Sequence, residues 1–158
     1  MEKYLIISNP TYPKGTFANL YTDGACRGNG NQKSLSGAGA VMFDEENKVI
    51  GEFKKFLGHG KTNNVAEYEA LILGLKEALK MNIKVINVYV DSKLLTEQVR
   101  GNYKVKNVGL KPLFEEVKNL KSMFDKFRIT HVLRHLNSHA DRLANEAISE
   151  IKNIYINK

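Results

Sequence analysis

The sequence predicts an α/β fold in which helices cover a mixed β-sheet. Two observations lead to this class. Three short, largely apolar runs follow one another near the N-terminus, and helix and strand patterns then alternate to the end of the chain. Consecutive short strands pair antiparallel, whereas a strand reached through a helix pairs parallel, so the sheet should contain both kinds of pair.

The first three elements are expected to be strands at residues 17–22, 38–43 and 48–57. The first two runs are largely apolar and are bounded by glycine-rich stretches. The third places Val49, Ile50, Phe53 and Phe56 among polar residues. Short runs of this kind, with turn residues between them, are typical of paired strands.

The period then changes to that of a helix over residues 62–81, where apolar side chains recur at steps of three and four. Residues 84–90 are rich in β-branched side chains and are expected to form a strand. The remaining elements should be a short helix, a longer amphipathic helix, a strand and a last helix, at residues 91–100, 110–124, 127–133 and 138–151.

Length and composition describe one ordinary domain. The chain has 158 residues, of which 42% are hydrophobic and 26% charged, and its one cysteine, Cys26, cannot form an internal disulfide. Its apolar runs are too short for a signal peptide or a membrane span. We expect a cytoplasmic monomer with no membrane contact, in which residues 1–16 are an N-terminal extension and residues 17–158 the domain.

The positive charge lies in the second half of the chain. The net charge is +7: residues 1–79 carry 9 basic and 9 acidic side chains, and residues 80–158 carry 15 and 8. Such a field attracts the phosphates of nucleic acids. A solvated, lysine-rich surface is the equally acceptable alternative, because the chain contains no block of five or six like charges.

Four carboxylates stand at element boundaries. Asp23 ends the first expected strand, Glu67 lies early in the first long helix, Asp91 follows the strand at 84–90, and Asp141 lies in the first turn of the last helix. If the strands of Asp23 and Asp91 are parallel neighbours, both side chains emerge at one edge of the sheet. Oxygen-only ligands suit Mg²⁺ or Mn²⁺, and two such ions about 4 Å apart activate water for phosphodiester hydrolysis.

Each of these carboxylates also has a purely structural interpretation. The segments 64–67 and 138–141 fit the helix-capping pattern, Asp91 could cap the helix after it, and Asp23 followed by glycine is an ordinary turn. Glu67 argues against this interpretation, because it falls beside Leu71 at the margin of the apolar helix face, where a carboxylate needs a partner.

Five segments in order resemble a type 1 ribonuclease H, over residues 17–151. They are YTDGACRGN at 21–29, SGAGAV at 36–41, TNNVAE at 62–67, VYVDS at 88–92 and ADRLAN at 140–145. The resemblance implies the ribonuclease H-like fold, a five-stranded mixed sheet flanked by helices. It also implies an endonuclease that cuts the RNA strand of an RNA/DNA hybrid, leaving a 3′-hydroxyl and a 5′-phosphate.

The resemblance further implies a role for individual residues. Asp23, Glu67, Asp91 and Asp141 match the family's metal ligands for two Mg²⁺ ions, with Mn²⁺ as a substitute and Asp23 at the centre. His135 is the best match to a histidine that assists proton transfer or product release. Contacts to the hybrid are implied for Asn29, Thr62, Asn63, Asn64 and Lys93, although the family commonly has glutamine where this chain has Lys93. The long basic protrusion of some relatives is absent, and Lys104, Lys106 and Lys111 offer a smaller substitute.

Two other functions remain open at this point. One is a nucleic-acid-binding module that keeps the fold but does not cut. The other is a nuclease of the same wider group that acts on another nucleic acid. The asparagines at 29, 63 and 64 favour a hybrid, because amides can bond the 2′-hydroxyls that mark an RNA strand. The local alternative is that they stabilise turns and a helix start.

Overall fold

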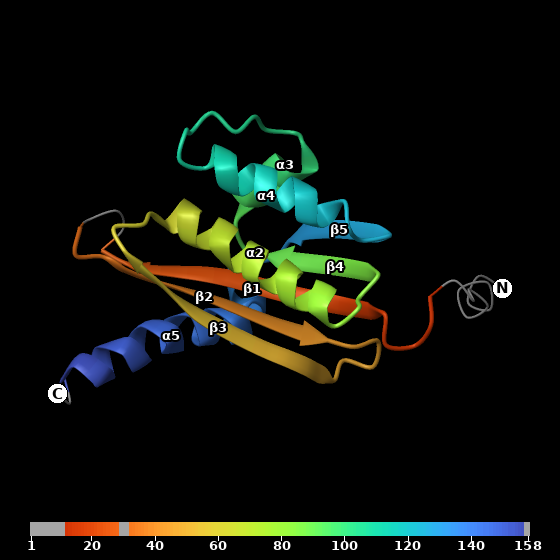
Figure 1. Ribbon diagram of the computed structural model, residues 1–158, viewed down its shortest axis with the longest axis horizontal. Coiled ribbons are helices and arrows are strands. Elements are labelled where there is room, and N and C mark those ends of the chain that lie inside the picture. Colours follow the sequence, from red (N-terminus) through yellow and green to blue (C-terminus); the bar gives the residue numbers. More distant parts are fainter. Residues whose placement is uncertain (1–11, 29–31, 157–158) are drawn as a thin grey trace.

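The computed structural model describes residues 12–28 and 32–156, and its centre is the mixed sheet that the sequence predicts (Figure 1). The strand order is β3-β2-β1-β4-β5. β1 pairs antiparallel with β2, which pairs antiparallel with β3, whereas β1–β4 and β4–β5 are parallel pairs. The strands are β1 (Phe17–Arg27), β2 (Leu35–Phe43), β3 (Val49–His59), β4 (Val85–Val90) and β5 (Lys126–His131).

The helices lie on both faces of this sheet. They are α2 (Asn63–Lys80), α3 (Lys93–Arg100), α4 (Lys111–Lys121) and α5 (Ser138–Ile156), with a short 3₁₀ turn, η1 (Arg134–Leu136), before α5. α2 packs against β1 and β2, and α4 packs on α2, whereas α5 packs mainly on the other face, over β1, β2 and β3 (Figure 1). The α2 face holds the main apolar core, which includes Leu20, Leu71, Leu75 and Val88.

Two glycines of β2 let α5 approach the sheet closely. A Cβ atom added to Gly37 would lie 2.2 Å from the backbone oxygen of Ala144, and one added to Gly39 would lie 2.2 Å from that of Ala140. Distances this short are impossible for real atoms, so any side chain at either position would push the helix away. The first turns of α5, which carry Asp141, therefore sit directly against the sheet.

The structure corrects the boundaries of several predicted elements. The expectation that the first strand ends at Asp23 is wrong, because β1 continues to Arg27 and pairs with β2 along this whole length. The predicted strand at 127–133 ends at His131, two residues before the predicted end, and His135 lies in the 3₁₀ turn η1 that follows it. The last helix runs to Ile156, five residues beyond the predicted end.

Most of the predicted N-terminal extension lies outside the described residues, as does Asn29. The part that is described is tied to the domain: Thr16 accepts hydrogen bonds at its carbonyl oxygen from the backbone N–H groups of Lys84 and Val85. Among residues 12–28 and 32–156, no helix has both the length and the apolar composition to cross a membrane.

Candidate active site

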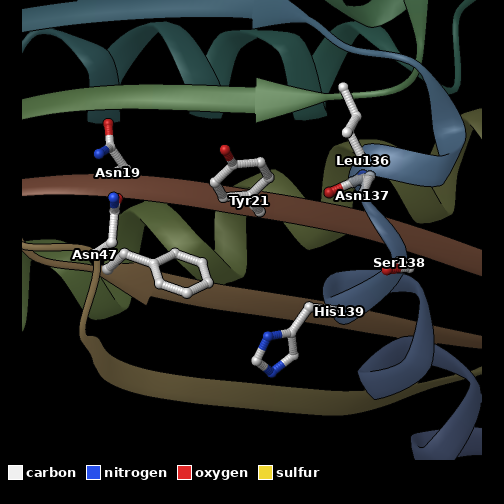
Figure 2. A pocket seen from close by; sticks show the side chains of 8 residues that line it. Asn19, Tyr21, Asn47, Leu136, Asn137, Ser138 and His139 are labelled. Atoms are coloured by element: carbon white, nitrogen blue, oxygen red, sulfur yellow. The ribbon is translucent and has the colours of Figure 1, made fainter.

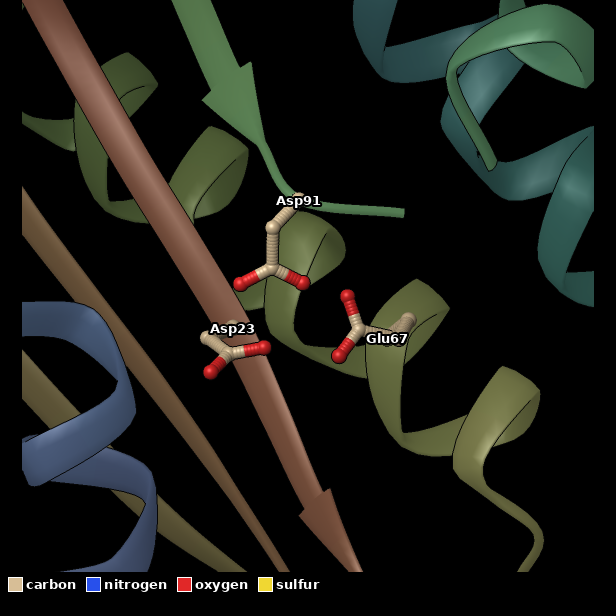
Figure 3. A group of neighbouring side chains, drawn as sticks. All are labelled: Asp23, Glu67 and Asp91. Atoms are coloured by element: carbon tan, nitrogen blue, oxygen red, sulfur yellow. The ribbon is translucent and has the colours of Figure 1, made fainter. Parts of the chain in front are cut away.

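Three of the four predicted carboxylates meet at one edge of the sheet. Asp23 comes from the middle of β1, Glu67 from the second turn of α2, and Asp91 from the first residue after β4 (Figure 3). One carboxylate oxygen from each lies within 4.8 Å of the others, which makes them the only candidate metal-ligand group of this kind in the described part of the chain. The parallel pairing of β1 with β4 brings Asp23 and Asp91 together, because both strands point toward this edge.

Gly24 allows α2 to bring Glu67 into this group. A Cβ atom at Gly24 would lie 2.3 Å from the carbonyl carbon of Ala66, so only glycine permits the helix and β1 to touch here. The contact lets the Gly24 N–H donate a 2.9 Å hydrogen bond to Glu67 Oε1. The other oxygen, Glu67 Oε2, is buried and has no protein hydrogen-bond partner.

The environment of the cluster opposes ionisation of Asp23 and Glu67, because it raises the pKa of both carboxyl groups. Burial raises the pKa of Asp23, and the neighbouring carboxyl groups of Glu67 and Asp91 raise it further. Burial also raises the pKa of Glu67, against the hydrogen bond from Gly24, which lowers it. Carboxyl groups that are crowded in this way require a compensating positive charge to be ionised together at neutral pH.

Asp141 stands at the border of this group. It lies in the first turn of α5, and its side chain is among the neighbours that raise the pKa of Asp23, so it reaches the same carboxyl. It is not one of the three residues whose oxygens lie within 4.8 Å of one another. Asn145, one turn later, donates hydrogen bonds to both the backbone oxygen and Oδ1 of Asp141, at 3.0 and 3.3 Å.

The structural alternatives for three of the carboxylates do not hold. Thr62 caps α2, accepting a 3.2 Å hydrogen bond from Val65 N–H, and Glu67 therefore lies beyond the capping positions. Ser92, not Asp91, caps α3 through a hydrogen bond from Leu95 N–H. Asp23 lies inside a strand rather than in a turn. None of these carboxylates is explained by local helix or turn chemistry.

Asn137 is a site residue that the sequence did not reveal. It is 1% exposed, and its Nδ2 donates to Asp91 Oδ2 at 3.1 Å and to the backbone oxygen of Thr22 at 2.9 Å. It therefore links the chain before α5 to β1 and to the carboxylate after β4. An asparagine just before a helix is a common N-cap in sequence, so this tertiary role left no distinct signal.

The remaining predicted residues that the structure describes are exposed near the starts of α2 and α3 and in η1. Thr62, Asn63 and Asn64 are exposed at the start of α2, and Lys93 is exposed at the start of α3. His135 is exposed in η1. Its neighbour Arg134, also missed in the sequence, is the positive charge that lowers the pKa of Glu67 against the effect of burial.

Comparison with known proteins agrees with this geometry. Residues 21–147 match the model of the family described as reverse transcriptase-like. Ribonuclease HI of Halobacterium salinarum is 34% identical, over 87% of this chain and 67% of the relative. The chain belongs to the ribonuclease H family. The fold agrees as well: the crystal structure of LC11-RNase H1 in complex with an RNA/DNA hybrid has a TM-score of 0.78 and 36% identity, covering 85% of this chain and 98% of that one.

Another relative is much longer than this chain. The bifunctional protein Rv2228c of Mycobacterium tuberculosis is 41% identical over 82% of this chain, but this match covers only 35% of the relative. The chain thus spans about a third of the length of that protein. Other relatives of this chain are named ribonuclease HI, in Halobacterium salinarum, and ribonuclease H, in Clostridium botulinum.

Proposed function

We propose that this chain hydrolyses the RNA strand of RNA/DNA hybrids, as an endonuclease that leaves a 3′-hydroxyl and a 5′-phosphate. The observation that carries the proposal is the group formed by Asp23, Glu67 and Asp91, whose oxygens lie within 4.8 Å of one another. Membership of the ribonuclease H family supports the reaction. The hybrid bound in the LC11-RNase H1 structure supports the substrate.

The residues present fit divalent cations. The ligand atoms are all carboxylate oxygens, which Mg²⁺ and Mn²⁺ prefer, and Glu67 Oε2 is buried without a partner. Asp23, Glu67, Asp91 and Asp141 would hold two Mg²⁺ ions, and Asp23 is proposed as the central residue of this group. Such cations, when bound, supply the positive charge that polarises a water molecule and stabilises the leaving oxygen.

The chain itself holds the carboxylates in place. The Gly24 N–H orients Glu67, and the Asn137 amide orients Asp91 while fixing it to the carbonyl oxygen of Thr22. Hydrogen bonds of this kind around metal ligands keep the ligands in a productive geometry. His135, which is exposed in η1 and follows Arg134, is proposed to assist proton transfer or product release.

The exposed start of α2 is proposed to read the hybrid. Asn63 and Asn64 carry amides that can bond the 2′-hydroxyls of the RNA strand, and the Thr62 hydroxyl is assigned to a phosphate of the DNA strand. Lys93, at the start of α3, would contact a phosphate. Asn29, which lies outside the described residues, is also proposed to contact the hybrid. We further propose that residues 17–158 form the catalytic domain and residues 1–16 an extension of it.

Cleavage of four end-labelled substrates tests the proposal. RNA/DNA hybrid, duplex RNA, duplex DNA and single-stranded RNA are each incubated with the wild type or Asp23→Asn, in Mg²⁺, Mn²⁺ or EDTA. The expected result is metal-dependent cutting of the hybrid that the variant lacks. Asp125→Asn, a change of the same type at an exposed position, is the matched control and should cut normally. Tight hybrid binding with no cutting of any substrate would instead indicate a binding module.

Asn63→Ala tests the reading of the RNA strand. Because the amide is assigned to 2′-hydroxyls, the variant should lose more activity on the hybrid than any residual activity on duplex RNA. Asn119→Ala, at an exposed position of α4, is the control. An equal loss on both substrates would contradict selective readout and favour a nuclease with another substrate.

A further inference from the structure

A pocket lies on the α5 face of the sheet. Its volume is about 260 Å³, and it opens between β1, the β2–β3 turn and the start of α5 (Figure 2). We call it the sheet pocket. Its walls include Asn19, Tyr21, Phe43, Asn47, Asn137 and His139. None of these residues belongs to the carboxylate group, and none is assigned above to the hybrid.

The aromatic side chains of the sheet pocket form one connected array. The Tyr21 ring stacks on Tyr89 of the neighbouring strand, with 4.7 Å between centroids and 18° between planes. The Tyr21 and Phe43 rings form a T-shaped contact with 5.6 Å between centroids, and the Phe43 and His139 rings form another with 6.0 Å between centroids. Aromatic faces held in this way are stacking surfaces for a planar ring.

A buried acceptor points into the pocket. The orientation of the Asn137 amide is fixed, because its nitrogen donates to two acceptors, Asp91 Oδ2 and the Thr22 oxygen. The oxygen, Asn137 Oδ1, is buried without a protein partner, and Figure 2 shows it turned toward the side of the Tyr21 ring. A buried oxygen of this kind needs a donor, so a ligand with an N–H group is favoured here.

The amides of Asn19 and Asn47 add further hydrogen-bonding groups. Asn19 Oδ1 accepts from the Tyr89 hydroxyl and the Asn87 amide at 3.4 and 3.5 Å, so the Asn19 nitrogen supplies donors. Asn47 is exposed on the β2–β3 turn and lines the same pocket. Carboxamides present a donor and an acceptor together, which matches the edge of a nucleobase.

A positive charge on the same face of the sheet favours a ligand whose planar ring carries an anionic group. Asn19 lies opposite Asn87 in β4, which lies opposite Arg128 in β5, so the three residues form one row across the sheet. Strands are about 4.8 Å apart, which puts the backbone of Arg128 about 10 Å from that of Asn19. Arg128 is exposed, and the chain carries a net charge of +7. A phosphate joined to the bound ring could reach this arginine.

We propose that the sheet pocket binds the base of a nucleotide, stacked against the aromatic array and donating a hydrogen bond to Asn137 Oδ1. The pocket volume of 260 Å³ is slightly below the roughly 300–1,000 Å³ of most ligand sites, so it fits a base rather than a whole nucleotide. The sugar and phosphate lie outside, toward Arg128. Because Asn137 also holds Asp91, the occupied pocket contacts the carboxylate group through a single side chain.

Titration of the protein with AMP, GMP, CMP and UMP tests the proposal. The titrations are followed by amide NMR shifts in EDTA, so that no metal ion can hold the phosphate. The expected result is saturable shifts at Tyr21, Phe43, Asn47 and His139 with at least one nucleotide. Absence of saturable shifts at these residues with all four would overturn the proposal, whatever the result of the cleavage assays.

Asn47→Gly is the informative variant. Asn47 has a φ of 63°, which glycine adopts freely, so the change removes the amide without straining the turn. The loss of one hydrogen bond should weaken binding about fivefold. Asn82→Gly is the matched control, because Asn82 also has a φ of 63° but lies in the turn after α2. Equal affinity of the two variants would contradict a role for Asn47 in the site.

Two further measurements test the roles of the base N–H group and of the phosphate of the nucleotide. N6,N6-dimethyl-AMP keeps the ring and phosphate but has no base N–H, so it should bind at least about tenfold more weakly than AMP. Arg128→Gln should weaken the binding of AMP but not the binding of adenosine, which has no phosphate. A site that favours the dimethylated base would overturn the assignment of Asn137 Oδ1.

The base could come from a free nucleotide or from an unpaired end of a nucleic acid. Hybrids with blunt ends and with single-nucleotide overhangs distinguish these sources, using Asp23→Asn to prevent cutting. If the hybrid with an overhang binds more tightly than the blunt-ended hybrid, and Asn47→Gly abolishes this difference, the base comes from a nucleic-acid end. Binding of mononucleotides with no effect of the overhang identifies a free nucleotide, and either result supports the pocket.

Discussion

Carboxylates occur in two very different settings in this protein. Between α5 and β3, Glu146 and Glu150 are exposed and paired: Lys54 Nζ lies 3.3 and 2.5 Å from their oxygens, and Arg142 adds a 2.9 Å contact to Glu146. Asp23 and Glu67, in contrast, are buried against each other. Arg134 is the only cation among the groups that shift their pKa values.

The pKa values show what the difference means. The hydrogen bond from Arg142 lowers the pKa of Glu146, so its ionised form is favoured. Burial raises the pKa of Asp23, so its ionised form is disfavoured. Exposed pairs contribute little to stability in either direction, whereas a buried group of like charges opposes folding unless a ligand compensates it. The buried group is therefore the one whose removal should stabilise the fold and abolish the function.

The largest expected effect is that of Asp23→Asn. The change removes the central carboxylate, so hybrid cleavage should fall by at least about 1,000-fold, as when an essential electrostatic group is deleted. The thermal midpoint in EDTA should rise, because repulsion with Glu67 and Asp91 is relieved. Steady-state cleavage and calorimetry measure the two changes. A variant that is both inactive and less stable would contradict the inference that Asp23 is repelled by Glu67 and Asp91.

Asn137→Ala should have the next largest effect. Without its amide, Asp91 loses the hydrogen bond that orients it, and changes of this kind typically cost about 10- to 100-fold in activity or metal affinity. The affinity for Mn²⁺, followed by the thermal midpoint against metal concentration, separates positioning from a general loss of stability. Asn119→Ala is the control. Normal metal affinity in a folded Asn137→Ala protein would rule out the positioning role.

Stability in EDTA should depend on pH in the direction set by the raised pKa values. A carboxyl whose pKa is higher in the folded state stabilises the fold below its unfolded pKa, about 3.9 for Asp, and this stabilisation is lost as the pH rises toward the folded value. Between pH 5 and pH 8 the wild type should therefore lose stability relative to Asp23→Asn. Saturating Mg²⁺ should reduce this difference, because bound cations favour the ionised carboxylates. A constant difference across this range in EDTA would contradict the raised pKa.

The smallest effect is expected at the exposed pairs. Lys54→Ala removes the cation that Glu146 and Glu150 share, yet all three side chains are solvated. The thermal midpoint should fall slightly, by less at high salt, and hybrid cleavage should be unchanged. A loss of activity comparable to that of Asn137→Ala would show that the two groups of carboxylates are coupled through α5.

The sequence was sufficient to predict the kind and order of the main elements and the mixed sheet. Apolar periodicity sets these features locally, and it distinguished the helix at α2 from the strand at β4. The prediction was wrong about the end of β1, because Asp23 and Gly24 have the composition of a turn, whereas β2 supplies backbone partners that keep the strand extended to Arg27. Local preference yields when tertiary pairing is available.

The sequence also predicted a site of four carboxylates, because each stands near an element boundary and together they match a family pattern, and three of the four lie together in the structure. It could not give their spacing. The close group of Asp23, Glu67 and Asp91 exists because β1 and β4 are parallel neighbours and because Gly24 has no side chain to keep α2 away. Asn137 and Asp91, which form a hydrogen bond, are 46 positions apart, and the sheet pocket joins residues between 19 and 47 to residues 136–139. Hydrogen bonds and cavities of this kind depend on packing in three dimensions, and only the tertiary structure decides them.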